Sequence, residues 1–204
     1  MARFVPWALI LFRAAASPVL LIDAADGTAS PAFLPLFLAA FLADVFDGIV
    51  ARRLGIQTAA MRSADSFADV ALYGCAAASA WLAKRSLVEP FVVPALAVIG
   101  LQLLAWLFDV AKYRRLSSYH CWSAKAWGVA QAAAAVALFG FDRTGAWLWT
   151  AIAVGVLNNL ECIAITWILP AWIHDVPSIV HARRIALTLR AEDRSRSDPQ
   201  RDSP

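Results

Sequence analysis

The sequence is short of charged residues. Of its 204 residues, 16% are Asp, Glu, Lys or Arg, whereas 61% are apolar. A soluble domain contains roughly 25% charged and about 45–50% apolar residues. The mean hydropathy is +0.62. This composition excludes an intrinsically disordered chain and a coiled coil, and it argues against an ordinary water-soluble enzyme.

Cysteine and histidine are also scarce. The three cysteines, Cys75, Cys121 and Cys162, are far apart and form no Cys-x-x-Cys pair, and the three histidines lack the spacing of metal ligands. These patterns argue against a disulfide framework and against a zinc site. The net charge of +3 is too small to indicate a nucleic-acid partner.

Long apolar segments dominate the chain instead. Each is near the length that crosses a bilayer, about 20 residues. They are residues Val5–Ile22, Ala32–Val50, Phe67–Leu82, Phe91–Val110, Ala124–Phe139 and Trp147–Leu169. The first is longer than the apolar core of a removable signal peptide needs, so we interpret it as a retained helix. The sequence therefore predicts an all-α, polytopic membrane protein with a bundle of six transmembrane helices.

The loop charges predict the orientation of this bundle. Fourteen Lys and Arg residues lie on the side of the two termini and three lie on the opposite side. Because cytoplasmic loops carry the excess of positive charge, we expect both termini in the cytoplasm. The Ala- and Arg-rich composition hints at a bacterium with a GC-rich genome. We therefore expect an integral, multi-pass protein of a bacterial inner membrane.

The C-terminal region differs from the predicted transmembrane domain, residues 1–175. Residues 176–190 mix apolar side chains with His181, Arg183 and Arg184. They are predicted to form either a short amphipathic helix on an anionic leaflet or a basic tail that only sets topology. Residues 191–204 are rich in Asp, Arg and Ser and are predicted to be disordered.

Two pairs of aspartates lie at membrane depth. Asp44 and Asp47 are at the cytoplasmic end of the second segment, and Asp65 and Asp69 open the third. Spacings of three and four residues place each pair on one helical face. The two segments form a hairpin, so both pairs should meet at one membrane interface. Ionisable groups there are costly and mark functional sites by default.

Four converging carboxylates need positive charge between them. Mg²⁺ prefers oxygen ligands and is often shared with substrate phosphates, and two such ions can clamp a phosphoryl group. Gly48 has no Cβ and so permits the close approach of a bulky ligand, and the Arg52 fork can reach a phosphate oxygen. The alternative is a set of helix-end charges, since Asp65 suits a helix N-terminus.

This pattern resembles the signature of the CDP-alcohol phosphatidyltransferases, Asp-x2-Asp-Gly-x2-Ala-Arg-x8-Gly-x3-Asp-x3-Asp. The string DVFDGIVARRLGIQTAAMRSADSFAD, from Asp44 to Asp69, matches at seven of the eight fixed positions. The six-segment layout also agrees with the family. Arg13 followed by Pro18 looks like the Arg…Pro opening of its first helix.

The resemblance implies a membrane transferase of substituted phosphate groups that acts in phospholipid biosynthesis. Such an enzyme moves a phosphatidyl group from a CDP-linked donor, typically CDP-diacylglycerol, to a small alcohol and releases CMP. Members similar to phosphatidylglycerophosphate synthase look closest, which makes glycerol 3-phosphate the favoured acceptor. An inositol phosphate, serine or another alcohol stays open. Family members commonly pair as homodimers.

The resemblance also implies roles for individual residues. Asp44, Asp47 and Asp65 would hold two Mg²⁺ or Mn²⁺ ions, whereas Asp69 would assist the second ion and act as the base for the acceptor hydroxyl. The residues that would line the cytidine diphosphate site are Gly48, Ala51, Arg52 and position 61.

Position 61 is the one departure from the signature, because Met61 replaces its second glycine. We expect Met61→Gly to raise the affinity for the donor. The alternative reading is a catalytically altered or silent member that binds cations without turnover.

Basic residues are candidates for an acceptor phosphate: Arg13, Arg114, Arg115 and Lys125. Arg114 and Arg115 are equally suited to anchoring their loop on lipid headgroups. Asp109 and Glu161 are further acids near or within the apolar segments. We expect these two acids to pair with Arg13 or Lys125 inside the bundle, with a substrate contact as the alternative.

Overall fold

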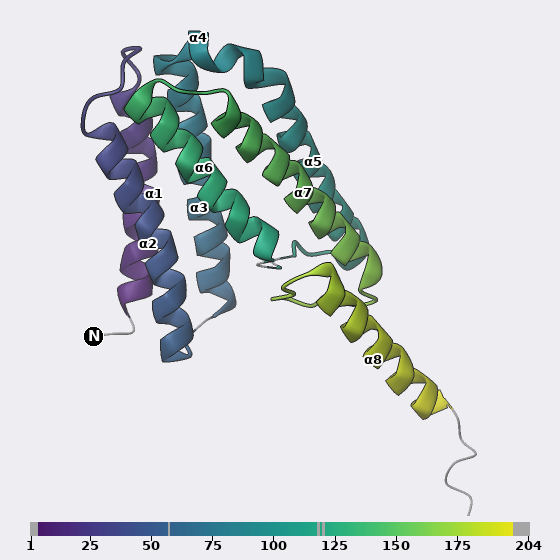
Figure 1. Cartoon of the computed structure of the whole chain (residues 1–204). Helices are drawn as coiled ribbons and strands as arrows, with labels where there is room; N and C mark the ends of the chain where they lie inside the picture. Colours follow the sequence, from purple (N-terminus) through teal and green to yellow (C-terminus); the bar gives the residue numbers. More distant parts are fainter. Residues whose placement is uncertain (1–3, 57, 118, 120, 198–204) are drawn as a thin grey trace, which may run out of the picture. The chain divides into compact units, whose positions relative to one another are not determined.

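The computed structural model describes residues 4–56, 58–117, 119 and 121–197, and all regular structure in these ranges is helical. The elements are α1 (Val5–Asp23), α2 (Phe33–Leu54), α3 (Ala59–Ala83), α4 (Arg85–Val88), η2 (Glu89–Phe91), α5 (Val92–Tyr113), α6 (Trp122–Phe141), α7 (Ala146–Ile168) and α8 (Ile179–Ser197) (Figure 1). Six helices in the described ranges are long and apolar enough to cross a membrane. The prediction of an all-α, multi-pass membrane protein is confirmed.

The third helix begins earlier than its apolar segment. It starts at Ala59 rather than Phe67, and the Thr58 hydroxyl caps it by accepting the N–H of Met61 at 3.1 Å. This side chain satisfies one of the N–H groups that a helix start leaves without a partner. Hydropathy marks the part of a helix that lies in lipid, so it missed the polar first turns of α3. It also gave no sign of the short α4 and η2.

A tight hairpin joins α2 to α3. Gly55 has φ +63°, in the left-handed region where a side chain would be strained. The N–H of Ile56 donates to the carbonyl of Ala51 at 3.3 Å. This 6→1 bond around a left-handed glycine ends α2 as a Schellman motif. Because α3 begins only a few residues later, the polar ends of the two helices are neighbours.

The described chain divides into two units, and residues 1–93 and 129–151 form the first. In this unit α1 packs against both α2 and α3 (Figure 1). Leu20, Phe37 and Leu72 are buried in its main core. A second apolar cluster joins Ile10 of α1, Ala51 of α2 and, from α3, Met61 and Ala68. These contacts hold the three helices together beside the α2–α3 hairpin.

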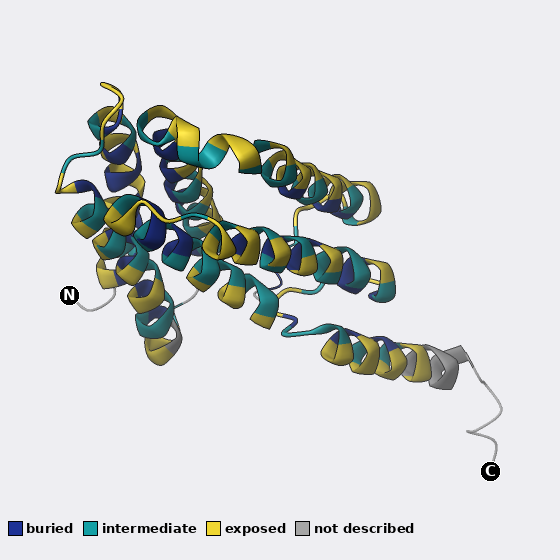
Figure 2. Cartoon of the chain, turned by 45° about the horizontal axis from the view of Figure 1, so that its top comes forward, coloured by how far each residue is buried: buried dark blue, intermediate teal, exposed yellow. Residues whose placement is uncertain are grey.

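The second unit contains residues 94–128 and 152–204. Its core includes Tyr119, Ile165 and Ala182, so the first turn of α8 packs against the end of α7. Exposed faces run along the long helices of both units (yellow in Figure 2) and carry large apolar residues such as Leu107 and Trp167. Exposed apolar side chains are what a lipid-facing surface requires.

The C-terminal helix is longer than the sequence indicated. α8 continues to Ser197, so residues 191–197 are helical where we expected disorder, and 198–204 lie outside the described residues. No glycine or proline occurs between Ile179 and Pro199. Ala, Glu and Arg favour a helix even in a very polar segment. The contact of α8 with an anionic leaflet stays a prediction.

Candidate functional site

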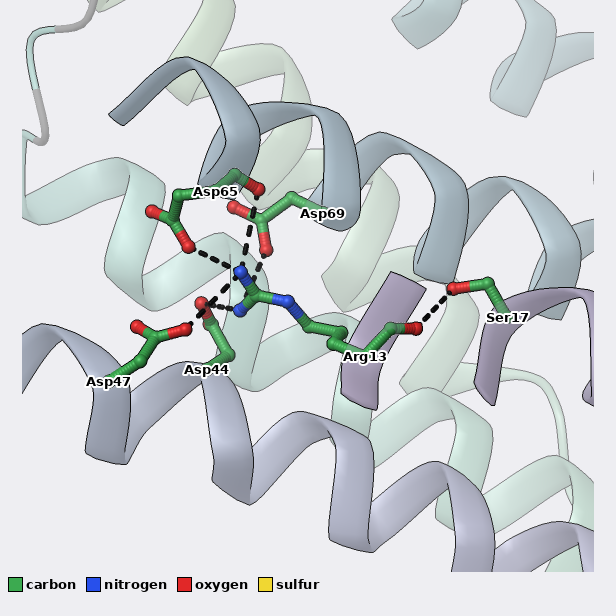
Figure 3. Close-up of polar contacts among 6 residues, drawn as sticks. All are labelled: Arg13, Ser17, Asp44, Asp47, Asp65 and Asp69. Carbon is green, nitrogen blue, oxygen red and sulfur yellow. Dashed lines mark hydrogen bonds and ion pairs between the residues drawn. The ribbon is translucent and has the colours of Figure 1, made fainter. Parts of the chain in front are cut away.

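The four aspartates meet in the first unit. Asp44 and Asp47 come from α2, and Asp65 and Asp69 come from the first turns of α3 (Figure 3). Carboxylate oxygens of Asp44, Asp47 and Asp65 all lie within 4.8 Å of one another. The helical spacing of each pair and the Gly55 turn together produce this arrangement, as the sequence indicated.

Arg13 of α1 lies at the centre of the four carboxylates (Figure 3), and its side chain is fully buried. Its Nη1 donates to Asp44 Oδ1, and its Nη2 donates to Asp65 Oδ1. Nη2 lies 3.4 Å from Asp47 Oδ2, and Nη1 lies 3.3 Å from Asp69 Oδ1. The expected pairing of Arg13 with Asp109 or Glu161 is therefore wrong, because its partners are the aspartates of the signature.

The site has an excess of negative charge. Four ionised carboxylates against one guanidinium leave a formal charge of −3. Like charges a few ångströms apart repel strongly where water is scarce. Asp47 Oδ2 and Asp69 Oδ1 are buried and accept no hydrogen bond from the described residues, so the ion-pair contacts with Arg13 are what they have there. The cluster is thus able to accept more positive charge than Arg13 supplies.

The donor set fits a hard divalent cation. All candidate ligands are carboxylate oxygens, the type that Mg²⁺ and Mn²⁺ prefer. Asp47 is 4% exposed, and its Oδ2 is one of the oxygens without a hydrogen bond. A buried carboxylate oxygen that lacks a donor is costly unless an ion or a donor completes it. The residues present therefore fit the divalent metal that the resemblance implies.

The residues predicted to line the nucleotide site lie beside the aspartates in sequence but differ in surroundings. Gly48 is half-buried in α2, and the side chain of Arg52 lies outside the described part of the chain. Ala51 packs against Met61 in the second apolar cluster. Met61 is 6% exposed, so its side chain fills a space between helices. The nucleotide contacts of these residues stay a prediction.

The remaining basic candidates belong to the second unit and are exposed. The Arg115 guanidinium lies 5.7 Å from the centre of the Trp172 ring. Lys125 Nζ lies 4.3 Å from the centre of the Trp122 ring. Cation–π contacts of this kind suit residues at a membrane interface. For Arg114, Arg115 and Lys125, binding of an acceptor phosphate stays a prediction.

The two further acids satisfy backbone and hydroxyl groups of the second unit instead of pairing with Arg13 or Lys125. The Thr166 hydroxyl donates to Asp109 Oδ1 at 2.6 Å, and the Ser117 N–H donates to Asp109 Oδ2 at 3.1 Å. Glu161 accepts the N–H of Ile179 at 3.3 Å, where α8 begins. Our expectation for these acids is corrected. No local pattern reveals partners this distant in sequence.

Tyr119 and Cys121 form hydrogen bonds that are structural. The Tyr119 hydroxyl lies 2.8 Å from the Thr166 hydroxyl, and the Cys121 thiol donates to Asn158 Oδ1 at 3.4 Å. Both residues are buried. They connect the loop after α5 to α7 within the second unit.

A comparison with protein-family models matches residues 3–157 to a model described as CDP-alcohol phosphatidyltransferase. The matched range contains α1, α2 and α3, and therefore Arg13 and all four aspartates. Comparison with curated proteins and with solved structures gives no significant match.

Proposed function

The chain belongs to the CDP-alcohol phosphatidyltransferase family, and we propose from this premise that it transfers a phosphatidyl group from CDP-diacylglycerol to glycerol 3-phosphate. Membership makes the protein a membrane transferase of substituted phosphate groups that acts in phospholipid synthesis on a CDP-alcohol and an alcohol. The observation that supports placing the reaction at this site is the convergence of four carboxylates on the Arg13 guanidinium.

The proposed reaction is an in-line displacement at phosphorus. The acceptor hydroxyl oxygen forms a bond to the phosphorus that bears the diacylglycerol. The bond from this phosphorus to the bridging oxygen breaks, and CMP leaves with that oxygen and its electron pair. The hydroxyl proton passes to a carboxylate. Charge accumulates on the non-bridging and leaving oxygens, so fixed positive charge accelerates the step.

Three aspartates would hold the divalent ions: Asp44, Asp47 and Asp65. Bound there, two Mg²⁺ or Mn²⁺ ions would neutralise the donor diphosphate and the leaving CMP. The chain supports this by placing Asp47 in a buried position, where few water molecules compete for its oxygens. The hairpin at Gly55 keeps the α2 and α3 ligands in register.

Asp69 is the proposed base. Its side chain is 39% exposed, compared with 30% for Asp44, 22% for Asp65 and 5% for Asp47. The most exposed of the four carboxylates is the one that a hydroxyl from solution reaches most readily. A general base must come within hydrogen-bond distance of the proton that it removes. Exposure therefore favours Asp69 for proton removal and the deeper aspartates for holding ions.

The remaining candidate residues are divided between the two substrates. Gly48, Ala51 and Arg52 bind the cytidine diphosphate portion, and Arg114, Arg115 and Lys125 are the candidates for the acceptor phosphate. Arg13 is committed to the aspartates, so a contact with a substrate phosphate requires its release from them. The active site faces the cytoplasm of a bacterial inner membrane, and the protein pairs as a homodimer.

The test is release of CMP from CDP-diacylglycerol by purified protein, with glycerol 3-phosphate, inositol phosphate and serine compared as acceptors. We expect turnover with glycerol 3-phosphate in Mg²⁺ or Mn²⁺, none in EDTA, and none in Asp69→Asn. Asp26→Asn is the control, because Asp26 is an exposed loop acid whose carboxylate accepts the N–H and the hydroxyl of Thr28. Equal release by wild type and Asp69→Asn would refute the enzymatic proposal. A protein that binds Mn²⁺ but turns over no acceptor would be the silent family member.

A further inference from the structure

Arg13 occupies an unusual position for a basic residue in a membrane helix. Its side chain has no exposed surface, and it reaches the α2 and α3 aspartates from α1 (Figure 3). A buried charge is stable only when it is paired. Among the described residues, the ion-pair partners of Arg13 are the four signature aspartates. Arg13 is therefore the counter-ion of this cluster.

The guanidinium uses oxygens that a metal ion would also need. Nη1 is bonded to Asp44 Oδ1, and Nη2 is bonded to Asp65 Oδ1. Asp44 and Asp65 are two of the three residues whose oxygens lie within 4.8 Å of one another. A cation placed among these oxygens would meet the guanidinium at very short range. Two positive groups repel there, since few water molecules screen them.

The backbone at Arg13 belongs to the regular helix α1, whereas the guanidinium lies at the end of a long side chain. The Ser17 hydroxyl donates to the Arg13 carbonyl at 2.8 Å (Figure 3). Arg13 Nε is buried and has no hydrogen-bond partner among the residues that the structure describes. The guanidinium is held by the four carboxylates and by the backbone carbonyl of Asp65, to which Nη2 donates at 3.4 Å. If those oxygens bind an ion, the long, flexible side chain of Arg13 is the part that moves.

We propose that Arg13 and the divalent ions compete for the same carboxylate oxygens, so that Arg13 holds the four aspartates together without metal and withdraws when ions bind. This inference rests on the metal site of the proposed function. Arg13 acts through the aspartates and is a positioning residue. It keeps α1, α2 and α3 packed around a cluster that would otherwise repel itself.

The test measures Mn²⁺ affinity, with no substrate present. Full-length protein in detergent is stripped with EDTA, and free Mn²⁺ is followed by electron paramagnetic resonance during titration. Arg13→Met loses a competitor that makes two charge-assisted hydrogen bonds, so Mn²⁺ should bind about tenfold tighter or more. Arg13→Lys keeps one charge but cannot span two carboxylates. The Mn²⁺ affinity of this variant should therefore lie between those of wild type and Arg13→Met. Arg85→Met removes a charge that stacks on Trp81, away from the cluster, and should match wild type.

The outcomes separate the two proposals. If wild type fails to bind Mn²⁺, the metal site of the proposed function is wrong. If wild type binds Mn²⁺ and Arg13→Met binds it equally or more weakly, Arg13 supports the ions and the competition is refuted. Melting adds a second readout, because Arg13→Met should melt below wild type in EDTA and recover in Mn²⁺.

If Arg13→Met does not fold, the wild-type protein still tests whether Arg13 and the ions compete. With ¹³C-labelled arginine, the guanidinium signal that is missing from Arg13→Lys identifies Arg13. Saturating Mg²⁺ should shift this signal and increase the rotational freedom of the group. A signal that Mg²⁺ leaves unchanged would overturn the proposal.

Discussion

Met61 gives the sharpest prediction, because it is the one departure from the family signature. Its side chain is 6% exposed and packs with Ile10, Ala51 and Ala68. Removal of a buried methionine side chain costs about 2–5 kcal/mol. For a chain of this size each kcal/mol corresponds to about 2–4 °C in melting temperature. We therefore expect Met61→Gly to melt on the order of 5–15 °C below wild type.

The assay is thermal unfolding in detergent followed by tryptophan fluorescence, since Trp7 packs on this cluster. Ser63→Gly, at an exposed position of the same helix, measures the backbone cost of a glycine, about 1 kcal/mol. Phe67→Ala, at a 75% exposed position, measures the loss of an apolar side chain outside the core.

Donor binding by Met61→Gly completes the test. Because the side chain is used for packing, we expect no gain in affinity for CDP-diacylglycerol, unlike the expectation from sequence alone. If Met61→Gly melts no lower than Ser63→Gly and binds the donor more tightly, the methionine lies against the nucleotide and the packing argument is wrong.

Three further variants test other parts of the structure. Asp69→Asn should lower CMP release by about 10²–10⁴-fold or more, to the level seen without protein, and its helical circular dichroism should match wild type, because the proposed general base is lost; a normal rate would refute the enzymatic proposal. Thr166→Val should lower the unfolding free energy by about 1–3 kcal/mol, because it removes the hydroxyl that donates to Oδ1 of the buried Asp109; unchanged melting would show that this bond is not stabilising. Replacing both Arg183 and Arg190 of α8 with Gln should weaken binding of an α8 peptide to anionic vesicles by about 1 kcal/mol per charge. If the variant and wild-type peptides bind equally, the positive charge of α8 serves only to set the membrane topology.

Much of the fold could be predicted because a membrane limits the choices. Apolar segments of bilayer length predicted the six long helices. The spacings of three and four residues between aspartates predicted two acidic helix faces. The hairpin brought these faces together. What the sequence could not show was the ends of helices, where polar residues continue a helix, as at the start of α3 and the end of α8.

The partners of isolated charges were harder to predict. Arg13 contacts Asp44 and Asp65, which lie 31 and 52 residues away, so no local pattern links them. One signal was available, since a lone arginine inside an apolar helix must find acids, and the signature aspartates lie at the same end of the bundle. The surroundings of Met61 gave no such signal, because a sequence does not state which way one side chain points.

The central claim is that the four aspartates bind divalent ions, and anomalous scattering from crystals grown in Mn²⁺ tests it most directly. Anomalous peaks should lie among the carboxylates of Asp44, Asp47, Asp65 and Asp69, within bonding distance of their oxygens. Crystals that contain Mn²⁺ only elsewhere, or that show these carboxylates turned away from one another, would contradict the account.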